Sequence, residues 1–98
     1  MDVKEMSTEA LCQEAERVII QMIRIANRAA IRIDPMLHRY QVCINELARR
    51  QVAGQQIVIL GEPLSHHDLA EMLIGIPEEL TNLIDWRGQR LLQVGYLN

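Results

Sequence analysis

Phenylalanine is absent from this 98-residue sequence, and its aromatic residues are one Trp and two Tyr. A core without phenylalanine has to be filled by Ile, Leu, Val, Met and Ala. So few aromatic rings also leave little surface for stacking bases or sugars, which argues against a single-stranded nucleic-acid reader of the stacking type. The length suits one domain, near the small end of chains that fold alone. We therefore expect a single domain over residues 1–98 with an aliphatic core.

Cysteines and long apolar runs are equally scarce. Cys12 and Cys43 are too few for a disulfide framework and predict buried free thiols in a cytoplasmic protein. The apolar run 18–23 is cut by Gln21 and followed by Arg24, far short of the roughly 20 residues of a membrane span, and no signal peptide precedes it. We expect a cytoplasmic chain with no membrane partner.

Motifs for catalysis or metal binding are also lacking. Ser7 and Ser65, the two serines, stand where helices begin, neither thiol has a sequence-evident base, and no Gly-rich phosphate loop is present. His67 and Glu71 are four residues apart, but two ligands do not make a metal site and His38 stands alone. We expect no enzyme activity, no metal and no cofactor.

The apolar pattern predicts a mainly α fold, a small four-helix domain with one short extended strand. A first helix is expected from Ser7 or Thr8 to about Arg32. Its apolar residues follow two adjacent seams and make a very wide face, which has to be covered from more than one direction. We therefore predict a homodimer, with an interface on this helix that includes Val18, Met22, Ile25 and Ala29.

A second helix is predicted to begin at Asp34, with Pro35 in its first turn, and to stop at Gly54. Four of its residues are expected to face inward: Leu37, Tyr40, Ile44 and Leu47. The β-branched run 57–60 then predicts a short strand. Since no second clear strand is present, we expect this strand to pair with its twin in another subunit, with Val58 in the dimer interface.

Two more helices are expected in the last third of the chain. Ser65 and Asp68 match a capping box, Gly75 is expected to end the short third helix, and Pro77 opens the last helix. That helix is expected to stop by Gly95.

The capping box and the spacing of the following apolar positions are similar to a helix-turn-helix. The positions are Leu69, Ala70, Leu73, Leu80 and Leu83. Over residues 64–97, about a third of the chain, the sequence resembles the terminal DNA-binding segment of Crp/Fnr-type transcriptional regulators, which would imply DNA binding. Two features depart from that pattern. Gly75 falls one residue late for the turn, and the segment after Pro77 has no Arg or Lys in its first two helical turns.

Charge is divided along the chain. Residues 10–53 carry seven Arg and four acidic residues, a net charge of +3, whereas residues 54–98 carry a net charge of −4. Five polar residues align on the first helix, and three arginines continue on the second: Arg17, Gln21, Arg24, Arg28, Arg32, Arg39, Arg49 and Arg50. This stripe is either a solvated face or a basic groove for acidic protein surface or phosphates.

Together these features predict a small, homodimeric regulatory protein, bacterial in style, that acts by binding another protein as an antiactivator, adaptor or chaperone-like factor. The alternative is a helix-turn-helix transcription factor, but phosphates would be repelled by the acidic second half. Arg and aromatic residues dominate interface energetics. The candidate anchors for an unidentified regulatory or effector protein are therefore Arg24, Arg28, Trp86 and Tyr96, although Trp86 is equally compatible with the core.

Overall fold

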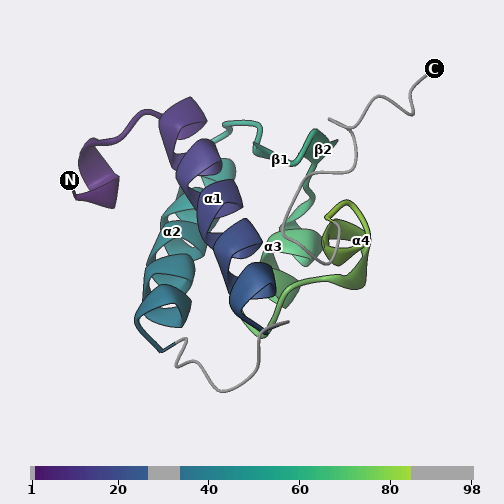
Figure 1. Cartoon of the computed structure of the whole chain (residues 1–98). Coiled ribbons are helices and arrows are strands. Elements are labelled where there is room, and N and C mark those ends of the chain that lie inside the picture. The colour runs from purple at the N-terminus through teal and green to yellow at the C-terminus, as the bar shows by residue number, and fades with distance from the viewer. Residues whose placement is uncertain (1, 27–33, 85–98) are drawn as a thin grey trace.

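The computed structural model describes residues 2–26 and 34–84 of the chain. Figure 1 shows a mainly helical fold in which a short 3-10 helix precedes the first long helix. The elements are η1 (Val3–Glu5), α1 (Thr8–Ala26), α2 (Asp34–Val52), β1 (Val58–Ile59), β2 (Glu62–Pro63), α3 (His66–Met72) and α4 (Glu78–Thr81). Within the described residues, the predicted four α-helices and short extended segment are confirmed.

The starts and stops of the long helices follow local capping chemistry. The Ser7 hydroxyl accepts a hydrogen bond from the amide of Ala10 at 3.1 Å, as expected of an N-cap side chain. At the end of α2, Gly54 has a φ of +104°, and the Gln55 amide donates to the carbonyl of Arg50 at 3.1 Å. This left-handed glycine and its six-to-one hydrogen bond form a Schellman motif. The predicted stop of α2 at Gly54 is confirmed, whereas the predicted end of α1 near Arg32 lies outside the described residues.

Helices α1 and α2 lie side by side and run antiparallel, so that the start of α1 meets the end of α2 (Figure 1). The apolar core fills the space between them, under the hairpin and α3. Its largest fully buried side chains are Tyr40, Leu11, Ile19, Ile44, Leu47, Ile57, Ile59, Leu60, Leu69, Met72, Leu80 and Val18. As predicted, the core is almost entirely aliphatic.

Two residues of the predicted dimer interface on α1, Val18 and Met22, are buried within the single chain, which corrects that part of the prediction. Val18 is 2% exposed and Met22 is 7% exposed, and both α2 and β1 pack against α1. The prediction assumed that one short chain could not cover this face. Both side chains are buried in the core of the single chain, so neither Val18 nor Met22 is left for another subunit.

Strand β1 pairs in antiparallel fashion with β2, with Val58 opposite Pro63 and Ile59 opposite Glu62. The two-residue turn between them has positive φ at both Leu60 (55°) and Gly61 (80°), the pattern of a type I′ hairpin. The predicted strand is therefore confirmed, but the premise that the chain offers it no second strand is wrong. Its partner is the segment that immediately follows. Leu60 takes a backbone conformation that favours glycine because its side chain is 1% exposed and completes the core.

The α3–α4 pair begins with the predicted capping box. The Ser65 amide donates to Asp68 Oδ2 at 2.8 Å, and the Asp68 amide donates to Ser65 Oγ at 3.1 Å. The Tyr40 hydroxyl of α2 donates to the carbonyl of Gly75 at 3.3 Å and so fixes the turn after α3 against the long helices. In the described residues α4 spans a single turn, and the predicted continuation of the last helix past residue 84 lies outside them.

Gly54 and Gly75 offer a matched test of the left-handed stop of α2. An added Cβ would meet no heavy atom within 4 Å at either position, but only Gly54 has a positive φ. We expect Gly54→Ala to lower the free energy of unfolding by about 1 kcal/mol, because an L side chain is strained in that conformation. Gly75→Ala should leave it unchanged or slightly raised. Equal losses in urea denaturation of the two variants would contradict this assignment.

Candidate functional site

The arginine stripe predicted from the sequence is largely paired with carboxylates of the same chain. Glu14 of α1 accepts two hydrogen bonds from Arg17, at 2.9 and 2.8 Å, and one from Arg39 of α2 at 3.1 Å. One glutamate therefore holds two guanidinium groups and links the two long helices.

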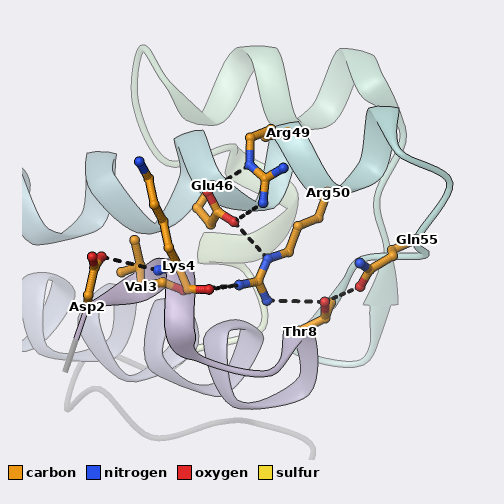
Figure 2. Close-up of polar contacts among 8 residues, drawn as sticks. All are labelled: Asp2, Val3, Lys4, Thr8, Glu46, Arg49, Arg50 and Gln55. Atoms are coloured by element: carbon orange, nitrogen blue, oxygen red, sulfur yellow. Dashed lines mark hydrogen bonds and ion pairs between the residues drawn. The ribbon is translucent and has the colours of Figure 1, made fainter.

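Glu46 of α2 holds a second pair of arginines (Figure 2). Arg49 Nε donates to Glu46 Oε1 at 3.0 Å, and Arg50 Nε donates to Glu46 Oε2 at 2.9 Å. Unlike Arg17, Arg50 is buried, with 6% of the residue exposed, and Glu46 is 5% exposed. Buried charges have to be paired and hydrogen-bonded, because removing them from water is costly.

Arg50 satisfies its remaining donors on the N-terminal part of the chain. It donates to the carbonyls of Val3 at 3.0 Å and Lys4 at 3.4 Å, and to the Thr8 hydroxyl at 3.2 Å. The Thr8 hydroxyl in turn bonds Gln55, just beyond α2 (Figure 2). Arg50 thus joins η1 and the start of α1 to the end of α2, and its role here is structural.

The same hydrogen bonds shift the titration of both glutamates. Arg17 and Arg39 lower the pKa of Glu14 to about 2, and Arg49 and Arg50 lower the pKa of Glu46 to about 2, in both cases against the opposing effect of burial. Four described arginines of the stripe, Arg17, Arg39, Arg49 and Arg50, are therefore held in ion pairs with carboxylates of the same chain. Arg28 and Arg32 of the stripe lie outside the described residues.

Only some of the residues predicted to bind a partner or a second copy lie in the described part of the chain. Arg24 is exposed on α1. Of the predicted dimer contacts, Val58 is 41% exposed on the hairpin, while Val18 and Met22 belong to the core. Four of the others lie outside the described residues: Arg28, Ala29, Trp86 and Tyr96. For Ile25 the backbone is described but the side chain is not.

A groove of about 640 Å³ runs between the N-terminal half of α1 and the hairpin; we call it the α1–hairpin groove. It is lined by Thr8, Glu9, Cys12, Gln13, Glu16, Gln56, Val58, Leu60 and Gly61. Its volume lies in the range of ligand-binding clefts. No motif in the sequence indicated it, because its two walls are some 45 residues apart in the chain.

Side chains of α1 close the outer edge of β1 at the bottom of this groove. The Leu60 amide donates to Glu16 Oε2 at 3.2 Å. Burial raises the pKa of the Cys12 thiol. A hydrogen bond from the Val58 backbone acts in the opposite direction and is the smaller influence on that pKa. The Leu60 amide, which a hairpin edge would otherwise present to another strand, is therefore occupied.

A second surface feature is an apolar turn between α3 and α4, which we call the Ile74 turn (residues 73–75). Ile74 is 91% exposed and Leu73 is 37% exposed. Leu37, also 37% exposed, lies one helical turn before Tyr40, whose hydroxyl reaches the Gly75 carbonyl. Ile74 was not among the residues predicted to bind a partner, although its position just before a turn glycine was a usable signal.

Among residues 2–26 and 34–84, no group of three or more His, Cys, Asp or Glu side chains could hold a metal ion. His67 Nε2 lies 2.7 Å from Glu71 Oε1 on α3, the spacing of a simple surface pair. None of the helices in the described part of the chain has the length and apolar character needed to cross a bilayer. No protein-family model matches the sequence, and comparison with curated proteins and with solved structures finds no significant similarity.

Removing Arg50 should destabilise the fold far more than removing Arg17. Arg50→Ala leaves the buried Glu46 with only the exposed Arg49 and takes the donor from the Val3 carbonyl, so we expect a loss of about 3 kcal/mol. Arg17→Ala breaks an exposed pair and should cost less than about 1 kcal/mol. Urea unfolding of both variants measures the difference, and comparable losses would contradict a central role for Arg50.

Acid should destabilise the protein in a defined window. The pKa values of Glu14 and Glu46 are depressed from 4.5 to about 2 in the folded chain. Between these limits the unfolded chain binds more protons, so stability present above pH 4.5 is lost as the pH falls toward 2. We expect Glu46→Gln to be less stable at neutral pH and to lose less stability on acidification. Thermal melts of the wild type that do not change across this window would refute the assignment.

Proposed function

We propose that the chain is a small cytoplasmic regulatory protein, bacterial in style, that acts by binding a regulatory or effector protein, in the manner of an antiactivator, adaptor or chaperone-like factor. The observation that carries this proposal is the Ile74 turn. An isoleucine with 91% of its surface exposed, next to the exposed Leu73, presents apolar area that gains free energy when a partner covers it.

The Ile74 turn is held in position before any partner arrives. The amides of Ile74 and Gly75 both donate to the carbonyl of Glu71, at 3.0 and 3.1 Å, and Tyr40 holds the Gly75 carbonyl. Burial raises the pKa of Tyr40, so its hydroxyl stays protonated and continues to donate. A preorganised apolar side chain loses little conformational entropy on binding, which favours its use as an anchor.

A second copy of the chain is one partner that this surface suits, and the homodimer remains part of the proposal. Because Val18 and Met22 are buried in the core, we place the dimer contact at the Ile74 turn instead. A two-fold axis beside the turn would bring two copies of the same apolar patch together, as isologous interfaces do.

DNA binding by α3 and α4 is the alternative, because the two helices and their intervening turn are present as the resemblance implies. The surrounding charge supports protein binding instead. Glu78 and Glu79 are both exposed in the first turn of α4, where a recognition helix would meet phosphates. Four arginines of the described residues already pair with Glu14 and Glu46.

Changing Ile74→Ser should weaken partner binding while the fold survives. We expect the affinity for a captured partner, or for a second copy, to fall by about tenfold or more, since truncated anchors cost more than about 1 kcal/mol. Val52→Ser is the matched control, because Val52 is 78% exposed near the end of α2, away from this turn. Both variants should melt within about 0.5 kcal/mol of the wild type.

The measurements are sedimentation of the purified chain and affinity capture from its host after nuclease treatment. A protein partner or dimer lost with Ile74→Ser and kept with Val52→Ser supports the proposal. A defined DNA operator bound at physiological salt, and lost on changing Thr81 or Asn82, would establish the alternative.

A further inference from the structure

We propose that His67 and Glu71 of α3 form one half of a zinc site, and that a second copy of the chain completes the site with the same two residues. The inference rests on the homodimer at the Ile74 turn proposed above. It adds a metal bridge to that dimer, through side chains that lie beside the apolar contact.

The two donor atoms already converge in the single chain. His67 and Glu71 are four residues apart on α3, and His67 Nε2 lies 2.7 Å from Glu71 Oε1. At a tetrahedral zinc ion with Zn–N and Zn–O distances of about 2.0 to 2.2 Å, two ligand atoms are about 3.4 Å apart. The pair therefore opens by less than about 1 Å to admit the ion, which takes the place of the proton between the two atoms. That proton is released to solvent.

Both side chains are accessible to a metal ion. The side chain of His67 is 78% exposed, and that of Glu71 is 49% exposed. An exposed pair of this kind contributes little to stability, so the fold loses little when metal ligation replaces it. An imidazole nitrogen beside a carboxylate oxygen suits Zn²⁺, whereas Mg²⁺ and Ca²⁺ prefer oxygen ligands alone. The chemistry of the pair therefore favours zinc.

A single chain does not complete this site. Among residues 2–26 and 34–84, no third His, Cys, Asp or Glu joins these two in a group that could hold a metal ion. Structural zinc sites have four ligands. A two-fold axis repeats His67 and Glu71 on the second copy, which supplies two imidazoles and two carboxylates in all.

The dimer contact at the Ile74 turn brings the two halves together. Glu71 and Ile74 line the same surface hollow, and the Ile74 amide donates to the Glu71 carbonyl at 3.0 Å. An axis beside Ile74 therefore places the Glu71 carboxylates of both copies near one another, where they repel in the absence of a cation. A zinc ion with two carboxylates and two neutral imidazoles has no net charge. The metal thus removes the repulsion and bridges the copies.

The test is sedimentation of the whole chain in EDTA, in Zn²⁺ and in Mg²⁺. Zn²⁺ should lower the dissociation constant of the dimer by about tenfold or more, because a ligand that binds only the dimer favours it by mass action. Mg²⁺ should not. His67→Ala should remove the effect of zinc, and His66→Ala, which changes the neighbouring exposed histidine, should retain it. Titration calorimetry should give one zinc ion for every two chains.

Three outcomes would overturn the proposal. They are a wild type whose sedimentation Zn²⁺ does not change, an equal response of the two histidine variants to Zn²⁺, and equal effects of Zn²⁺ and Mg²⁺, which would indicate general screening of acidic side chains. The apolar contact is measured separately in EDTA. There Ile74→Ser should weaken the dimer and His67→Ala should not, so failure of the zinc site and failure of the Ile74 turn are distinguished.

Discussion

Burial of the Arg50 guanidinium is the constraint on which the arrangement of the two long helices depends. An arginine cannot lose its proton to escape the cost of burial, so each of its donors needs an acceptor. The end of α2 alone supplies only Glu46. The remaining acceptors are the carbonyls of Val3 and Lys4 and the Thr8 hydroxyl, which come from η1 and the first residue of α1. Satisfying one side chain thus fixes where the N-terminal segment lies, and with it the direction of α1.

The position of α1 then sets the chemistry of the hairpin. Cys12 and Glu16 are one helical turn apart and meet the backbone groups of Val58 and Leu60 on the outer edge of β1. A two-stranded hairpin is marginal alone in water, and here its exposed edge is completed by helix side chains instead of a third strand. The α1–hairpin groove is the space above that contact. Its α1 wall carries Glu9, Gln13 and Glu16.

Local features of this fold could be predicted from the sequence, and long-range ones could not. The capping box of Ser65 and Asp68 and the glycine stop at Gly54 depend on residues within a turn of one another, so their spacing is visible in the sequence. The same spacing argument found the β1 strand but missed β2, because Glu62 and Pro63 have poor strand propensity and pair only through the turn at Gly61. The burial of Arg50 was invisible for a different reason. Its partners lie more than 40 residues away, and a charge stripe on a helix is ordinarily solvated.

The failed dimer contacts at Val18 and Met22 have the same origin. A wide apolar face indicates that a helix is buried on several sides. Its periodicity does not indicate whether the residues that bury it come from the same chain. In this protein α2 contacts both the N-terminal segment and the turn after α3. Arg50 near its end holds η1 and α1, and Tyr40 near its start holds the turn after α3. These two residues are separated by about 15 Å along one straight helix. The start of α1 and the Ile74 turn are therefore both held against α2, at positions that are fixed relative to one another by that helix.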